Sequence, residues 1–154
     1  MLLLNCKTIN KILQNFHFVS TPIRVRYSDT DQMGFVHHSN YLRYFEIARL
    51  EWLRELGFSY KAMEENKFFL PLASASVQYK KPCYFDDLLQ VGITLTTIPK
   101  ASLDFDYTIY NEKEELVATG TTRLAFFNAI TKTPTRCPEA LSVCFQSVLD
   151  ADQS

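Results

Sequence analysis

The sequence predicts an α+β fold in which a curved antiparallel sheet wraps around one long central helix. The first observation is a single long amphipathic segment, from about residue 39 to residue 56. The second is a series of segments after residue 71 in which apolar and polar residues alternate with period two, as in strands with one covered face. The third is the shortness of the connections between those segments, which favours antiparallel neighbours.

Length and composition favour one globular domain. The chain has 154 residues, enough for a sizeable core, and 47% of them are apolar. The net charge is −1 with both signs interspersed, so a nucleic-acid partner is not expected. We expect residues 1–15 to form an N-terminal extension and residues 16–154 a single domain.

The N-terminal sequence does not predict export or membrane insertion. It lacks the apolar core and the small-residue cleavage site of a signal peptide. No stretch approaches the roughly 20 apolar residues of a membrane span. Four cysteines are widely spaced without a C-x-x-C pair, which argues against a metal or redox motif; they are Cys6, Cys83, Cys137 and Cys144. Reduced thiols in a cytoplasmic protein are therefore expected.

The first half of the chain reads as a strand, a turn and the long helix. Residues 16–27 are expected to be extended, because Ile23, Val25 and Tyr27 alternate with polar residues. Ser39 or Asn40 is a candidate N-cap for the helix, and a glycine at residue 57 follows its last turn. One face of the helix carries an apolar stripe that we expect to be buried: Tyr41, Phe45, Ala48, Trp52 and Leu56, widened by Leu42 and Leu53.

The second half reads as strands followed by a final helix. A short helical segment is expected at residues 59–66. Four strands are then expected: three in which apolar residues alternate with polar ones from Ala73, Leu89 and Leu103, and a last one at residues 116–127. In the first of these the residues from Ala73 to Tyr79 at every second position are expected to face the core. A last helix is expected with Pro138 at its first position.

The connection between the first strand and the long helix concentrates polar and titratable residues. Two carboxylates, Asp29 and Asp31, precede Gly34, and His37 and His38 follow at the expected mouth of the helix. Aspartates in turns commonly bond their own backbone, and we interpret Asp29 in this way. His37 is interpreted as structural, and a metal site is not expected because adjacent histidines rarely both reach one ion.

This connection resembles that of a known enzyme family. Residues 27–41 read Y-x-D-T-D-x-x-G-x-V-x-H-x-N-Y, and residues 45–53 read F-E-x-A-R-x-E-W-L. Both are similar to the hotdog-fold acyl-CoA thioesterases of the 4-hydroxybenzoyl-CoA thioesterase family, in particular to the bacterial branch encoded beside the Tol–Pal system. Residues 77–87, V-x-Y-x-x-P-x-x-x-D-D, resemble that family's second-strand block. The resemblance implies a hotdog fold and hydrolysis of acyl-CoA thioesters.

The resemblance implies that Asp31 is the catalytic carboxylate and that His38 lies beside it. Asp31 is expected to act as general base on water or as nucleophile, and the sequence leaves both open. Amides at the helix N-terminus, near Ser39 and Asn40, are expected to stabilise the oxyanion. Gly34 would let the backbone approach the thioester. Tyr27 is expected either to line the acyl pocket or to pack in the core.

The expected partners follow from the same interpretation. The substrate is an acyl-CoA or acyl-carrier-protein thioester, and no separate cofactor is expected. A small curved sheet leaves edge strands to be covered, so a homodimer or homotetramer is expected. Two alternatives remain: a hotdog hydratase or dehydratase acting on acyl-CoA, and a non-catalytic module that binds acyl-CoA or acyl carrier protein. Glu46, charged on a largely buried helix, is expected to have a structural partner.

Overall fold

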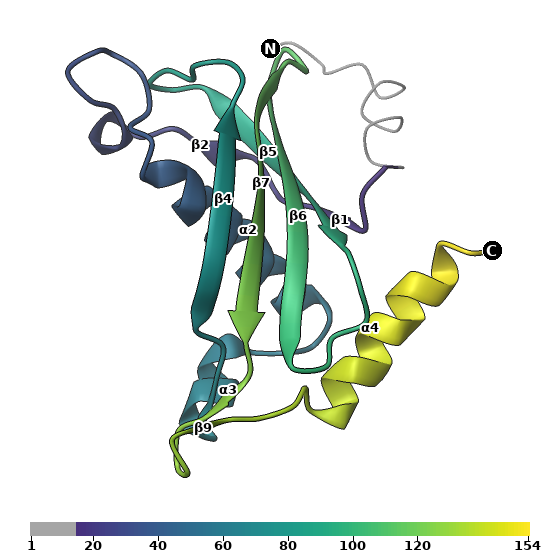
Figure 1. The fold of residues 1–154 in the computed structure, drawn as a ribbon. Coiled ribbons are helices and arrows are strands. Elements are labelled where there is room, and N and C mark those ends of the chain that lie inside the picture. Colours follow the sequence, from purple (N-terminus) through teal and green to yellow (C-terminus); the bar gives the residue numbers. More distant parts are fainter. Residues whose placement is uncertain (1–14) are drawn as a thin grey trace.

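A computed structural model describes residues 15–154 of the protein. The expected extension, residues 1–15, lies outside this part except for its last residue. One long helix lies against one face of a curved antiparallel sheet (Figure 1). The helix is α2 (Asn40–Glu55), and the sheet consists of β1 (Phe18–Val19), β2 (Ile23–Arg24), β4 (Leu72–Tyr79), β5 (Leu88–Leu95), β6 (Ser102–Asn111) and β7 (Leu116–Ala125). The expected α+β architecture is confirmed.

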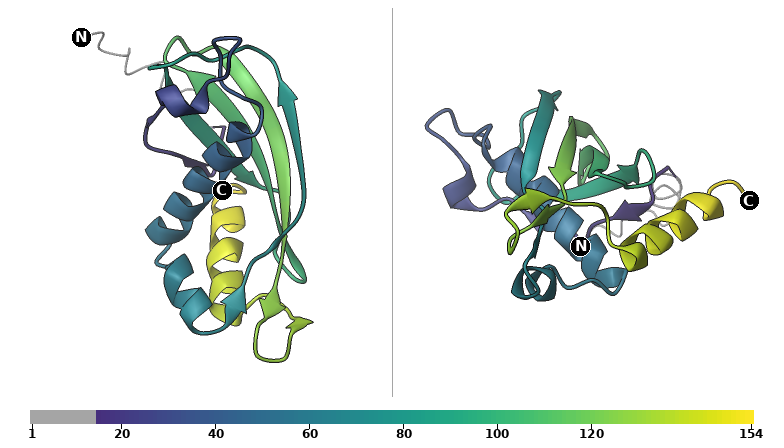
Figure 2. Two further views of the ribbon diagram at one scale, coloured as in Figure 1. Left: turned by 90° about the vertical axis from the view of Figure 1, so that its left-hand side faces the viewer. Right: turned by 60° about the horizontal axis from the view of Figure 1, so that its bottom comes forward.

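The sheet has the order β1–β5–β6–β7–β4, with β2 also pairing with β5, and every pair is antiparallel. Seen nearly edge-on in the left view of Figure 2, it curves around α2. β6 and β7 form its centre, and β4 forms one edge. The four strands expected after residue 71 are all present within a few residues of their expected bounds.

The expected first strand is wrong as a continuous element. It divides into β1 and β2, and the pairing register on β5 shifts by one residue between Val19 and Ile23. Two features explain the break. The side chain of Ser20 accepts the backbone N–H of Val91 at 3.0 Å, and Pro22 has no N–H to donate to a ladder.

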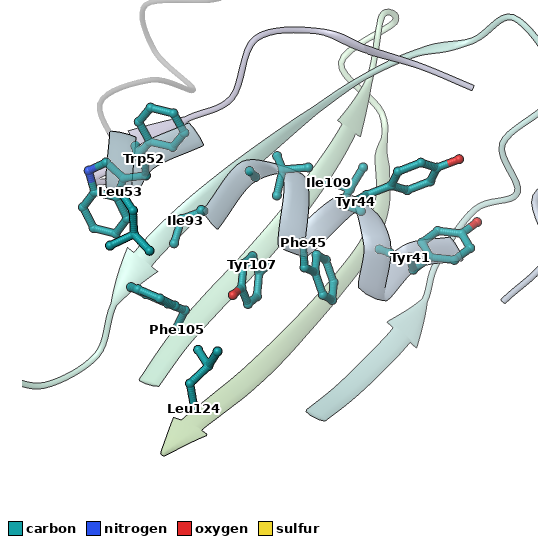
Figure 3. Close-up of a cluster of buried hydrophobic side chains, with 14 of the residues drawn as sticks. Tyr41, Tyr44, Phe45, Trp52, Leu53, Ile93, Phe105, Tyr107, Ile109 and Leu124 are labelled. Carbon is teal, nitrogen blue, oxygen red and sulfur yellow. The ribbon is translucent and has the colours of Figure 1, made fainter. Parts of the chain in front are cut away.

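The apolar stripe of α2 forms the core with the concave face of the sheet (Figure 3). Phe45 stacks on Tyr107 of β6 with ring centroids 4.3 Å apart. This contact requires Gly120 in β7, because a Cβ there would lie 2.5 Å from the Phe45 ring. The buried residues of the helix are Asn40, Tyr41, Tyr44, Phe45, Ala48, Arg49, Trp52 and Leu53. Leu42, expected to widen the stripe, is instead exposed.

The expected covered face of β4 is also wrong. Ala73, Ala75 and Tyr79 are exposed, and Val77 alone of that set is partly buried. β4 has one neighbour, β7, and it lies at the sheet's edge, where the helix covers little of it. Its eight residues carry no charge and no proline.

Smaller elements close the ends of the fold. Helix α3 (Tyr60–Glu65) begins after Ser59, whose hydroxyl accepts the N–H of Ala62. A second small sheet, not expected from the sequence, contains β3 (Phe68–Phe69), β8 (Phe127–Asn128) and β9 (Thr133–Pro134). Helix α4 (Glu139–Ala151) begins one residue after the expected start, and its Phe145 packs on Trp52 of α2.

Candidate active site

The turn that contains Asp31 is a closed loop between β2 and α2. Residues Thr30 and Val36 pair as an isolated antiparallel bridge, and the N–H of Asp31 donates to the carbonyl of Phe35 at 3.1 Å. Gly34 lies at φ +89°, in the left-handed region that favours glycine. Its N–H donates to the carbonyl of Asp31 at 3.0 Å. Gly34 is therefore required for the shape of the loop.

The carboxylate of Asp31 is half-buried and held on one side. Its Oδ1 accepts the backbone N–H of Met33 at 2.8 Å, which closes an Asx turn. Within residues 15–154 the other carboxylate oxygen accepts no hydrogen bond. One oxygen thus orients the group, and the second remains available for chemistry.

Asp29 has a different environment and fits the interpretation of a structural turn residue. Asp29 is 2% exposed, and its carboxylate accepts the N–H of Arg26 at 3.0 Å, two N–H groups of the Arg26 guanidinium at 2.9 and 3.5 Å and the Tyr44 hydroxyl at 3.0 Å. Burial opposes ionisation of Asp29, but these hydrogen bonds and the charge of Arg26 outweigh it and lower the pKa of the carboxyl. The 3₁₀ turn η1 (Tyr27–Asp29) brings these groups together.

The backbone of Asp29 fixes the mouth of α2. Its carbonyl accepts the N–H of His37 at 2.9 Å and the side-chain amide of Asn40 at 2.8 Å. The N–H of Asn40 donates to the carbonyl of His37 at 3.0 Å. Asn40 is buried, and its backbone N–H and its side-chain amide both donate hydrogen bonds within the protein. The geometry gives Asn40 a role in holding the mouth, whereas the sequence suggested a contact to substrate.

The N–H of His38 is a free donor at this mouth within residues 15–154. The peptide between His37 and His38 is trans, so its carbonyl and its N–H point in opposite directions. The carbonyl is turned toward the N–H of Asn40, in the first turn of the helix. The N–H of His38 therefore points outward, away from that turn. Among residues 15–154 no group accepts it.

The histidine side chains and Ser39 lie on the surface of the mouth. The His38 imidazole is exposed and lies against the His37 ring, with centroids 4.0 Å apart. His37 Nδ1 and the Ser39 hydroxyl are hydrogen-bonded at 2.8 Å. Ser39 occupies the N-cap position, but its side chain accepts no N–H of the helix. Its expected capping bond is replaced by the contact to His37.

Tyrosines surround the site in ways that the sequence did not fully indicate. Tyr27 is 79% exposed and packs edge-to-face on Phe85, so it does not belong to the core. The Tyr79 hydroxyl at the end of β4 donates to the carbonyl of His38 at 3.3 Å. Tyr44 lies one turn after Asn40, a spacing that places both on one helix face and could have indicated their shared contact with Asp29. No local signal pointed to Tyr79.

A cavity of about 450 Å³ lies between α2, α3 and the edge strand β4. Leu42, Glu46 and Leu72 contribute to its walls, and Arg49 lines it as well. Arg49 is buried and donates to the hydroxyl of Tyr107 at 3.1 Å. The carboxylate of Glu46 lies 3.8 Å from the Arg49 guanidinium, so Glu46 has the partner expected for it, although it remains largely exposed.

Neither a membrane-spanning helix nor a metal cluster is present in residues 15–154. No helix in this part is long and apolar enough to cross a membrane. No group of three or more His, Cys, Asp or Glu side chains in it is arranged to hold a metal ion. Cys83, Cys137 and Cys144, the cysteines that this part contains, are free thiols.

Comparisons with known proteins give a consistent result. The model of the thioesterase-like superfamily matches residues 25–145. The putative acyl-CoA thioesterase YneP of Bacillus subtilis is 35% identical over 100 residues, which span 65% of this chain and 72% of that protein. The acyl-CoA thioester hydrolase YbgC of Escherichia coli is 29% identical over 125 residues, 81% of this chain and 93% of that protein.

The comparison with solved structures agrees with this family match. The DHNA-CoA thioesterase from Staphylococcus aureus superposes with a TM-score of 0.82 and is 32% identical. The superposition covers 88% of this chain and 93% of that one. The residues matched by the family model, 25–145, include the candidate site and α2.

Proposed function

This chain belongs to the thioesterase-like superfamily and is a thioester hydrolase, and we propose that it hydrolyses acyl-CoA at the mouth of α2 with Asp31 as the catalytic carboxylate. Its fold is the hotdog-like fold expected from the sequence. One observation carries the proposal: the half-buried carboxylate of Asp31, with one oxygen free, lies in the loop that leads into α2. The carbonyl of Asp29 fixes the start of that helix, where the N–H of His38 has no acceptor among residues 15–154.

The N–H of His38 supports the electrophilic half of the reaction. It lies at the N-terminal end of α2, where the helix dipole adds positive potential. A thioester carbonyl oxygen that accepts this N–H would be polarised, and the negative charge that develops on it during attack would be stabilised. Ser39 and Gly34 are proposed to border the space that the thioester occupies, since both lie on the loop and mouth that define it.

The free oxygen of Asp31 supports the nucleophilic half, by one of two routes. As general base, Asp31 takes a proton from water while the water oxygen bonds to the carbonyl carbon, and the C–S bond then breaks to release CoA. As nucleophile, Asp31 bonds to the carbonyl carbon and expels CoA, and water then hydrolyses the resulting mixed anhydride. Both routes give a free acid and the CoA thiol. The exposed imidazole of His38 is proposed to orient the attacking water or to contact the thioester.

Substrate contacts and assembly belong to the same proposal. The exposed ring of Tyr27 is proposed to border the substrate at the rim of the site, since it does not lie in the core. We propose a homodimer joined through the uncharged edge strand β4, with a homotetramer as the larger alternative. The finer placement in the branch encoded beside the Tol–Pal system rests on the motif of residues 27–41. A cytoplasmic location and the absence of a separate cofactor remain expectations.

The test is release of free thiol from a panel of CoA thioesters by the wild type and by Asp31→Asn. Asp31→Asn replaces the carboxylate with a group of the same size, so we expect thermal unfolding to be unchanged and turnover to fall by at least about a thousandfold. Wild-type turnover by this variant would contradict the assignment of Asp31. Hydration of enoyl-CoA without thiol release would instead indicate the hydratase, and tight binding without either reaction would indicate a binding module.

A further inference from the structure

The cavity of about 450 Å³ between α2, α3 and β4 combines apolar walls with a buried charged group. Leu42 and Leu72 contribute apolar surface to it and are 36% and 48% exposed. Arg49 also lines the cavity and is only 8% exposed. Apolar walls with a small number of fixed polar groups are the usual composition of a small-molecule site. The cavity therefore fits a ligand that is mostly apolar and polar at one point.

The guanidinium of Arg49 is fixed on its inner side. Its Nη1 donates to the Tyr107 hydroxyl at 3.1 Å, and that hydroxyl is hydrogen-bonded to the Thr122 hydroxyl at 2.7 Å. The other two nitrogens of Arg49 make no hydrogen bond within residues 15–154. They are not sealed off either, because no fully buried side-chain nitrogen or oxygen in this part of the chain lacks a partner. Arg49 therefore presents unused donors to the cavity that it lines.

Glu46 supplies an acceptor beside these donors. Its Oε2 lies 3.8 Å from Nη2 of Arg49, which is too long for a direct hydrogen bond. A hydroxyl fits between the two groups, because its oxygen accepts a hydrogen bond from Arg49 while its proton is donated to Glu46. A methyl group makes neither bond, and a carboxylate brings a second negative charge beside Glu46. The other charged residues of the lining, Arg43 and Glu64, are exposed and of opposite sign, so the lining does not favour an anion.

The cavity lies on the side of α2 that continues from the mouth of the helix. Leu42 and Glu46 follow His38 at intervals of four residues, a spacing that places side chains on one helix face. β4 borders the same space, since Leu72 at its start lines the cavity and Tyr79 at its end donates to the carbonyl of His38. Glu46 lies about 12 Å along the helix axis from His38. An extended chain advances about 1.2 Å per bond, so an acyl group of about ten carbons spans this distance.

We propose that the cavity binds the far end of the acyl group, and that Arg49 and Glu46 select acyl groups of about ten carbons that end in a hydroxyl. The inference rests on the proposed function, because it names the substrate class for the same site. The apolar chain covers Leu42 and Leu72, and its terminal oxygen accepts from Arg49 and donates to Glu46. The thioester at the other end of the chain lies at the mouth of α2, beside the N–H of His38.

The first test compares three CoA thioesters of equal chain length: decanoyl-CoA, its ω-hydroxy derivative and its ω-carboxy derivative. We expect kcat/KM of the wild type to be about tenfold higher for the ω-hydroxy ester than for decanoyl-CoA, the factor that one hydrogen bond to a charged group supplies. We expect the ω-carboxy ester to be the poorest of the three. A value for the ω-hydroxy ester no higher than that for decanoyl-CoA, or a preference for the carboxylate, would overturn the proposal. Failure of the proposed function differs, since wild type would then release no thiol from any ester, or Asp31→Asn would release it as fast.

The second test removes the acceptor. Glu46→Leu is expected to fold normally, because the side chain of Glu46 is 62% exposed, and thermal unfolding checks this. We expect the preference for the ω-hydroxy ester over decanoyl-CoA to fall below about twofold. Glu55→Leu is the matched control, since Glu55 is exposed on the same helix and does not line the cavity, and it should keep the wild-type preference. An unchanged preference in Glu46→Leu, or an equal loss in both variants, would overturn the proposal.

A binding measurement gives a readout that does not depend on turnover. Asp31→Asn is titrated by calorimetry with decanoyl-CoA and with its ω-hydroxy derivative. We expect the Kd of the ω-hydroxy ester to be about tenfold lower, and we expect Glu46→Leu in the same background to remove this difference. Equal Kd values of the two esters for Asp31→Asn would overturn the selection of a terminal hydroxyl and would leave the assignment of Asp31 unaffected.

Discussion

Replacing Asp29 by asparagine tests whether its buried carboxylate stabilises the region that carries the site. The substitution keeps the size of the side chain and leaves the backbone carbonyl that binds Asn40 in place. It removes the charge and turns Oδ1, which accepts the Arg26 guanidinium, into a donor that faces that guanidinium. The remaining oxygen, at the Oδ2 position, can still accept both the Arg26 N–H and the Tyr44 hydroxyl.

The magnitude follows from the bonds that are lost or weakened. A hydrogen bond to a charged group contributes about 1.5–3 kcal/mol. The guanidinium of Arg26 is largely exposed, so its bond to Asp29 is screened by water and adds little. The bonds from the Arg26 N–H and the Tyr44 hydroxyl to Oδ2 are kept but change from a charged to a neutral acceptor, which weakens each by about 1 kcal/mol and lowers the free energy of unfolding by about 2 kcal/mol. For a chain of 154 residues this corresponds to a decrease in Tm of about 4–8 °C.

The pH dependence of the free energy of unfolding is an independent test of whether the Asp29 carboxylate stabilises the fold. The pKa of Asp29 is lowered in the folded state, so its stabilising contribution is complete above the unfolded pKa of about 3.9. It is lost as the pH falls through the lower folded pKa. Urea unfolding of wild type and Asp29→Asn should therefore differ by a constant amount between pH 5 and 7 and converge below about pH 4. Equal stability at pH 7, or a difference that persists in acid, would refute this account of Asp29.

Two further predictions concern the core. Gly120→Ala should lower the free energy of unfolding by about 2–3 kcal/mol, because the added Cβ would lie 2.5 Å from both the ring of Phe45 and the backbone carbonyl of Ser76. Gly92→Ala should lower it less, because the Cβ there would meet only the ring of Phe16. Similar melting temperatures for the two variants would contradict this order. Burial raises the pKa of Cys83 to about 11, so iodoacetamide at pH 8 should leave Cys83 unmodified in the native protein and modify it after unfolding, as peptide mass spectrometry would show.

The parts of the fold that could be predicted are those set by local periodicity. The bounds of α2 and the burial of Tyr41, Phe45 and Trp52 follow from a 3.6-residue repeat that needs no knowledge of distant contacts. The same holds for β5, β6 and β7, which lie inside the sheet and have a covered face. β4 has the same alternation, yet its Ala73 and Ala75 are exposed, because position within a sheet is not encoded in the period of one strand.

The candidate site was predicted only where a motif marked it. Asp31, Gly34 and His38 were indicated by the resemblance, and the structure places them on one loop and helix mouth. The contact of Asn40 with Asp29 depends on how the loop folds back on α2, which no local pattern reports. Tyr79 reaches His38 from 41 residues further along the chain, so its contribution required the sheet to be assembled first.

The central claim is that a carboxylate in the loop before α2 drives the loss of CoA from the thioester. The most direct measurement compares thiol release by Asp31→Asn and Asp29→Asn, each with its thermal unfolding curve. The account predicts that Asp31→Asn melts like the wild type and is nearly inactive, whereas Asp29→Asn melts earlier and, below its melting temperature, keeps substantial turnover. Full activity in Asp31→Asn with loss of activity in Asp29→Asn would contradict it.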